Sequence, residues 1–341
     1  MTTIDPPGAP AREQLTGRVL VWADAQFFLN PSDKTGLKLA GLSGPRRNHI
    51  AEAVPMRVVS TSGKLVEVET LEFDDGENDE ADCAWFDLKP GRDLGPVRLF
   101  VRRDDLAPVL TAPFETRFPD GTSIRVARGM PVIPLSDGRY QITLRKMPIA
   151  VALPSSSVGH AYRAAPEWIS HHHTWSLTTG APVTLGHDAY ATPNKAAYPF
   201  RAAAVERRGE LALFPLYSRC AEAIVAVPDR FVTRGKEGGS GDLGGWGFGT
   251  IGGADWFVAP DTPLTTTAGR VVTRSRAHIA VDRPAAGAKR VCFKRVLHIT
   301  TNAIWDRPDL TKKHDAGAVQ LCAPSSSVAR RTGFGHRRVP K

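Results

Sequence analysis

One cysteine of this sequence has neighbours that could support nucleophilic chemistry. Cys220 follows Ser218 and Arg219, and an adjacent cation lowers the pKa of a thiol when the two groups meet in space. Covalent catalysis also needs a base beside the nucleophile, and the motifs GxSxG, HExxH and Walker A are absent from the chain. We therefore expect Cys220 to be a buried core residue, and we predict no catalytic residues.

Three consecutive histidines, His171–His173, could offer imidazole ligands to a metal ion. Consecutive residues of a strand point to opposite faces, so at most two of these rings could share one ion. No nearby carboxylate completes the facial triad of metal ligands, which consists of two histidines and one carboxylate. We expect the histidines to be exposed or partly packed near Trp168 and Trp175, and we predict no metal site.

A glycine-rich stretch, residues 235–253, contains ten glycines in nineteen residues and two matches to the pattern GxGxxG. Dinucleotide binding by that pattern requires a preceding strand and a following helix, so that backbone N–H groups face a pyrophosphate. No helical periodicity follows here. We predict a loop that holds Trp246 and could fold over a ligand, and we predict no cofactor.

Positive charge is concentrated at the C-terminal end. The chain carries a net charge of +9, and residues 270–341 hold sixteen basic residues against four acidic ones. Such a region attracts polyanions, although a solvated face that keeps the protein soluble would have the same composition. We predict that the basic second half of the chain binds an anionic cell-wall polymer or a protein partner. Nucleic acid is a weaker candidate, because its binding platforms usually interleave more aromatics. The predicted binding residues are Arg274, Arg276, Arg290, Lys294, Arg295, Trp246 and Trp305.

Composition indicates an all-β protein. The 341 residues suit about two domains, and 31 glycines with 27 prolines favour many short strands and turns. No apolar run is long enough for a membrane-spanning helix. The start of the chain lacks the pattern of a signal peptide, so the chain is either cytosolic or a mature exported form. We favour the cell envelope or periplasm.

The four cysteines leave two alternatives open. Cys292 and Cys322 lie in strand-like segments and could pair across a sheet, or all four cysteines could be buried free thiols. No spacing typical of a zinc site occurs. Disulfides would require an oxidising compartment.

A repeated pentapeptide suggests an internal duplication. Pro-Ser-Ser-Ser-Val occurs at 154–158 and again at 324–328, each time after a strand-like segment. We expect two halves, 17–160 and 183–330, each made of two β modules. The predicted organisation is a flexible N-terminal linker (1–16), module 1 (17–110), module 2 (111–160), a linker (161–182), module 3 (183–234), a glycine-rich loop (235–254), a basic module 4 (255–328) and a basic tail (329–341).

Residues 17–110 and 183–233 resemble bacterial SH3-like (SH3b) modules. Both stretches open with a strand and an Asn-Pro or Thr-Pro turn, at Asn30–Pro31 and Thr192–Pro193, and close with segments such as 97–106 and 224–232. The resemblance implies tandem small β-barrels that bind cell-wall peptides or partner proteins without catalysis. The alternative is a hydrolase or transferase with a site between the halves, near His171–Trp175 and the glycine-rich loop.

Overall fold

The computed structural model describes residues 15–22, 24–38, 53–71, 83, 86–89, 93–144, 147–163, 175–193, 200–202, 204–218, 220–234, 256–301 and 314–330. Within these residues the chain forms β-strands and single-turn 3₁₀ helices, which confirms the predicted all-β class. None of the helices in this part of the chain has the length and apolar character needed to cross a membrane.

Four successive stretches, named units 1 to 4 here, each begin with a strand and end with a 3₁₀ turn and a short extended segment. Unit 1 (residues 18–106) contains β1 (Arg18–Trp22), β2 (Gln26–Phe27), β3 (Leu37–Lys38), β4 (Ala53–Ser62), β5 (Leu65–Thr70), β6 (Phe86–Lys89) and β7 (Arg98–Arg102). Unit 2 (residues 109–159) contains β8 (Val109–Leu110), β9 (Phe114–Arg117), β10 (Ser123–Val126), β11 (Ile133–Pro134), β12 (Tyr140–Leu144), β13 (Met147–Val151) and β14 (Val158–Gly159).

The second half of the chain repeats this plan after β15 (Ala161–Tyr162). Unit 3 (residues 175–234) contains β16 (Trp175–Leu177), β17 (Pro182–Leu185), β18 (Asp188–Ala191), β19 (Phe200–Ala202), β20 (Glu206–Arg208), β21 (Leu211–Ser218), β22 (Ala221–Pro228) and β23 (Val232–Arg234). Unit 4 (residues 256–330) contains β24 (Trp256–Val258), β25 (Pro263–Thr265), β26 (Val271–Arg274), β27 (Ile279–Val281), β28 (Arg290–Thr301), β29 (His314–Pro324) and β30 (Val328–Arg330).

The end of every unit has the same local structure. A strand runs into a 3₁₀ turn, which is η1 (Arg103–Asp105), η2 (Ser155–Ser157), η3 (Asp229–Phe231) or η5 (Ser325–Ser327). In η2 and η5 the third serine donates a hydrogen bond to the carbonyl of the preceding proline, at 2.6 and 2.7 Å. The two Pro-Ser-Ser-Ser-Val sequences therefore have the same conformation.

The segment after each turn pairs with the strand that opens the same unit. In units 2, 3 and 4 the closing strands β14, β23 and β30 pair antiparallel with β8, β16 and β24. In unit 1 a bridge between Leu106 and Val21 takes the same place. Each unit is thus closed by its own two ends.

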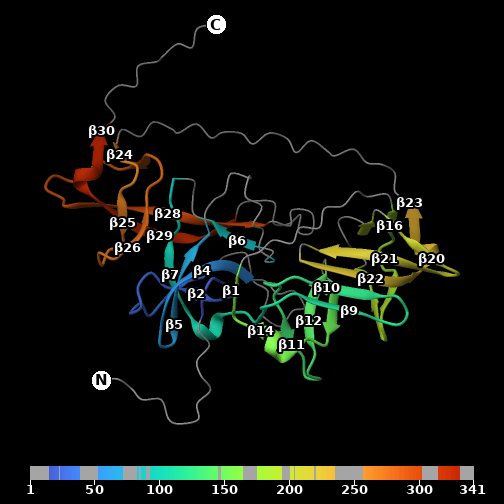
Figure 1. Ribbon diagram of the computed structural model, residues 1–341. Helices are drawn as coiled ribbons and strands as arrows, with labels where there is room; N and C mark the ends of the chain where they lie inside the picture. The colour runs from blue at the N-terminus through green and yellow to red at the C-terminus, as the bar shows by residue number, and fades with distance from the viewer. Residues whose placement is uncertain are drawn as a thin grey trace, which may run out of the picture.

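Apolar burial joins the units in nested pairs. One core cluster combines β1, β4, β5 and β7 of unit 1 with β24–β29 of unit 4, through residues such as Val66, Val68, Leu264 and Leu321. A second cluster combines units 2 and 3. Figure 1 shows β24–β30 beside β1–β7 and β16–β23 beside β8–β14. The first unit therefore packs on the fourth, and the second on the third.

Strands donated across unit boundaries reinforce both pairs. β6 of unit 1 extends the sheet of unit 4 by pairing with β28 at Phe86–Lys89. The β9–β10 hairpin of unit 2 pairs with β22 of unit 3. The stretch 161–182, predicted as a linker, contains β15, which pairs with β1, and β16, which opens unit 3. Chain segments between units are therefore part of the sheets.

Arg270 connects unit 4 to unit 1 at the edge of their shared core. Its guanidinium donates to the carbonyl oxygen of Leu29 at 2.6 Å and forms an ion pair with Glu67. It also lies over the ring of Phe100, 4.4 Å from the centroid. The side chains of Arg270 and Glu67 are only 22% and 17% exposed, so solvent screens this ion pair less than a surface pair.

We predict that Arg270→Lys lowers the free energy of unfolding by about 1–2 kcal/mol. Lysine keeps the charge but cannot reproduce the planar fork and the stacking on Phe100, and hydrogen bonds to charged groups are worth about 1.5–3 kcal/mol each. Urea unfolding measures the change. Arg274→Lys is the matched control, because Arg274 pairs with an exposed aspartate, Asp261, and is itself 59% exposed. Equal effects of the two substitutions would contradict this role of Arg270.

Candidate anion-binding face

The predicted basic residues of unit 4 lie on two different faces of the sheet. Alternation along β28 places Val291 and Leu297 in the shared core, with Arg295 on that same inner face. Arg290 and Lys294 occupy the opposite, outer face and are exposed. No ion pair among the described residues involves Arg290 or Lys294. These two cations are therefore available to a ligand.

Arg295 has a structural position. Its Nε lies 3.0 Å from the Asp93 carboxylate of unit 1, its Nη2 donates weakly to the carbonyl of Ala280, and its guanidinium lies over the Phe293 ring. The side chain is about one-quarter exposed. Arg295 therefore links unit 4 to unit 1, and we do not retain it as a ligand contact.

Arg274 and Arg276 lie at and just beyond the end of β26, and both are exposed. Arg274 donates to the side-chain and backbone oxygens of Asp261, at 3.2 and 3.0 Å. The backbone N–H of Arg276 donates to the carbonyl of Asp93. Two strands, β25 and β29, separate β26 from β28 in the sheet, so these two arginines do not lie beside Arg290 and Lys294. Trp246 and Trp305, the two predicted aromatic contacts, lie outside the described residues, as do His171–His173 and the stretch 235–253.

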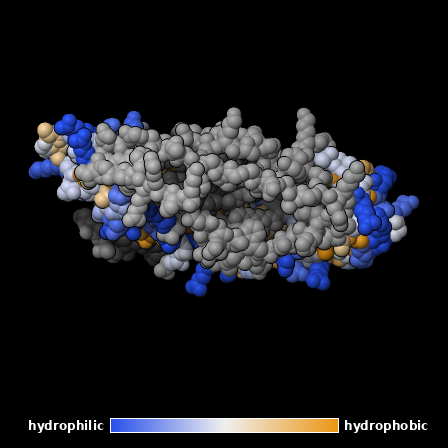
Figure 2. All heavy atoms as spheres, turned by 90° about the horizontal axis from the view of Figure 1, so that it is seen from above, coloured by the Kyte–Doolittle hydropathy of each residue, from blue (hydrophilic) through white to orange (hydrophobic). Residues whose placement is uncertain are grey.

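The described part of unit 4 is strongly basic. It contains nine basic residues, Arg270, Arg274, Arg276, Arg283, Lys289, Arg290, Lys294, Arg295 and Arg330, against Asp261, Asp282 and Asp315. Figure 2 shows hydrophilic side chains at both ends of the face that it displays, including the end where unit 4 lies. Arg283, Lys289, Arg290 and Lys294 are all exposed. The arrangement can hold an extended anion by charge and hydrogen bonding.

Both cysteine pairs are oxidised. Cys292 and Cys322, which face each other across β28 and β29, form one disulfide. Cys83 and Cys220 form the other across 137 residues. Of the two alternatives for the cysteines, the pairing of Cys292 with Cys322 is confirmed and four free thiols is wrong. Cys220 is buried as expected, and because its sulfur is bonded to Cys83 it is not a free thiol. Two disulfides are compatible with an oxidising, extracytoplasmic compartment.

Titratable side chains elsewhere form structural contacts. Arg139 bridges Asp137 and Asp188 at 2.8 and 2.7 Å, which links unit 2 to the β17–β18 hairpin of unit 3. The hydrogen bonds from Arg139 lower the pKa of the Asp137 carboxyl. The described residues include no group of three or more His, Cys, Asp or Glu side chains that could hold a metal ion.

Sequence reasoning missed three links between distant residues. These are the Arg270–Glu67 ion pair, the Arg295–Asp93 ion pair and the Cys83–Cys220 disulfide. All three join units, and no local pattern marks the partners. The only available signal was the even number of cysteines.

Comparison with known proteins gave no relative. No protein-family model, no curated protein and no solved structure matches this chain.

Tyr217 offers a test of packing at the sheet of unit 3. Burial raises the pKa of its hydroxyl, and the negative charge of Glu222 raises it further. A group whose pKa is higher in the folded state contributes stability below its unfolded value of about 10, and this contribution is lost as pH rises through the folded value. We predict that the difference in unfolding free energy between wild type and Tyr217→Phe is constant up to about pH 9 and shifts against wild type above about pH 10. Denaturant unfolding across this range measures it, and a difference that does not depend on pH would contradict the burial.

Proposed function

We propose that this chain is a non-catalytic binding protein of the bacterial cell envelope, built from four SH3-like units, that holds an anionic wall polymer on the outer face of unit 4. The observation that carries the proposal is the pair of exposed cations, Arg290 and Lys294, on one face of β28. Their unit carries three times as many basic as acidic residues in its described part.

The repeated closure supports the SH3-like assignment. The resemblance rests on an opening strand and a closing segment, and in all four units the chain after a 3₁₀ turn pairs with the opening strand of the same unit. The shared conformation of the Pro-Ser-Ser-Ser-Val turns in units 2 and 4 supports an internal duplication.

An envelope location agrees with the covalent structure. Disulfides form and persist in oxidising environments and are rare in the cytosol, and phosphate-bearing polymers are the polyanions of the envelope that an extended basic face would meet. Cys220 is bonded to Cys83 and is therefore not available as a thiol nucleophile. The site of the alternative, a hydrolase or transferase acting near His171–Trp175 and the glycine-rich loop, lies outside the described residues apart from Trp175.

Binding of the full-length protein to purified cell wall tests the proposal. The wall would be used with its phosphate polymer intact and with that polymer chemically removed, and DNA would serve as a competing polyanion. We predict retention only on the intact wall. Arg290→Gln/Lys294→Gln should weaken binding at all salt concentrations and reduce the slope of log affinity against log salt by about two, one for each phosphate contact removed.

The matched control removes the same charge elsewhere. Lys64→Gln/Arg117→Gln deletes two exposed cations from units 1 and 2 and should leave affinity and slope within error of wild type. Equal weakening by both pairs would show that only net charge matters. Unchanged binding by the Arg290→Gln/Lys294→Gln protein would overturn the assigned face. Equal retention on wall without its phosphate polymer would overturn the assigned ligand.

A further inference from the structure

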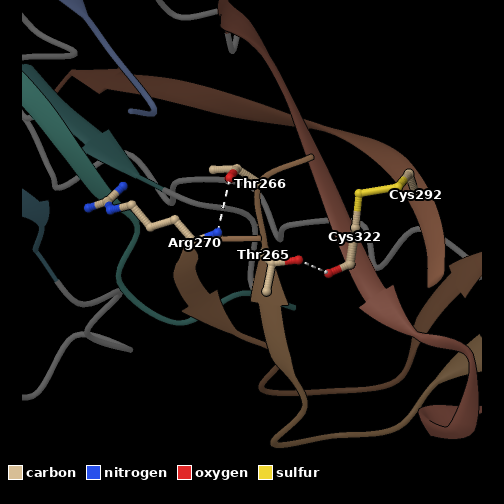
Figure 3. The surroundings of a disulfide bond; sticks show 5 residues. All are labelled: Thr265, Thr266, Arg270, Cys292 and Cys322. Atoms are coloured by element: carbon tan, nitrogen blue, oxygen red, sulfur yellow. Dashed lines mark hydrogen bonds between the residues drawn. A yellow bond between two sulfur atoms is a disulfide. The ribbon is translucent and has the colours of Figure 1, made fainter. Parts of the chain in front are cut away.

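The Cys292–Cys322 disulfide is unequally covered. Cys322 belongs to β29, which lies between β25 and β28 in its sheet, and it is 0% exposed. Cys292, opposite it on β28, is exposed. Figure 3 shows the bond reaching from Cys322 on β29 to Cys292 on the neighbouring strand, with Thr265 on the other side of Cys322.

Neighbouring groups hold the buried half of this bond in place. Thr265 pairs with Cys322, and its hydroxyl donates to the Cys322 carbonyl oxygen at 3.2 Å. An incoming thiolate must approach a disulfide along the sulfur–sulfur axis from outside. Only the Cys292 sulfur lies on a solvent-facing residue, so the attack has a single direction.

The exposed half of the bond lies between two cations. Arg290 and Lys294 are two residues before and two residues after Cys292, so all three side chains project from the same face of β28. The rise of a strand places the Cα atom of each of these residues about 7 Å along the strand from that of Cys292. Positive charge at this distance attracts negatively charged reagents.

We propose that Cys292 is a site of reversible S-thiolation that selects anionic low-molecular-weight thiols. The thiolate of the small molecule attacks the Cys292 sulfur and forms a mixed disulfide there. The Cys292–Cys322 bond breaks, and its electron pair leaves on the Cys322 sulfur as a thiolate, which takes up a proton. The exchange needs no other oxidant or reductant. It does not depend on the proposed wall binding.

The second disulfide is an internal reference. Cys83 and Cys220 are 6% and 7% exposed, so neither sulfur offers an open approach. Under native conditions the exchange should therefore occur at Cys292–Cys322 and leave Cys83–Cys220 intact.

The test treats the native full-length protein with three thiols of different charge and then alkylates free thiols. The reagents are 2-mercaptoethanesulfonate, 2-mercaptoethanol and cysteamine, whose thiolate forms carry net charges of −2, −1 and 0. Peptide mass spectrometry without reduction locates the adduct. We expect the mixed disulfide on Cys292 and the alkyl group on Cys322, with Cys83–Cys220 unmodified.

The selection for reagent charge is measured by comparing the reaction rates of the Arg290→Gln/Lys294→Gln variant with those of wild type. Two cations at about 7 Å, screened at a Debye length of about 10 Å, change the rate by about threefold per unit of reagent charge. The variant should therefore react about sevenfold more slowly with the dianion, about threefold more slowly with the monoanion and equally fast with the neutral zwitterion. Comparing each reagent with itself cancels differences in thiol reactivity. Lys64→Gln/Arg117→Gln should react like wild type.

Three results would overturn the proposal. The first is an adduct on Cys322 or on the Cys83–Cys220 pair before Cys292. The second is the same slowing of all three reagents in the variant. The third is the absence of any adduct until the protein is unfolded.

Discussion

Burial of apolar strands between units that lie far apart in the sequence is the constraint on which the other features depend. Small β units bury too little surface to be very stable alone, and here β5 of unit 1 shares its core with β25 and β29 of unit 4. That packing fixes which face of β28 points inward. It also brings Arg270 to Glu67 and Arg295 to Asp93, so charged links form at the margins of a contact that apolar residues create.

The outer face of β28 follows from the same packing. Because Val291 and Leu297 are held in the shared core, strand alternation leaves Arg290, Cys292 and Lys294 on the opposite face. The polymer binding and the thiol exchange that we propose use the same two cations for the same electrostatic reason. They differ in what they require next, since the first needs an extended polyanion and the second needs the exposed Cys292 sulfur.

Local features such as hairpins could be predicted from the sequence, whereas the pairing of residues far apart in the chain could not. In unit 1, for example, β4 and β5 form a hairpin with Gly63 at a positive φ of 59° in its turn. Period-two alternation and turn residues act over a few positions, so they report such hairpins. Pairing between β6 and β28, or between Cys83 and Cys220, depends on how whole units dock. Among the predicted binding residues, the sequence could not tell that Arg295 points inward, because that depends on the register of β28.

Native-state hydrogen exchange of Leu264→Ala tests the nested packing most directly. Leu264 is buried in the core that units 1 and 4 share, and a leucine-to-alanine change in a core costs about 2–5 kcal/mol. The account predicts that amides of β4 and β5 in unit 1 lose protection together with β28 and β29, while β21 and β22 in unit 3 keep theirs. A loss confined to unit 4 would contradict the shared core, and with it the orientation of the outer face of β28.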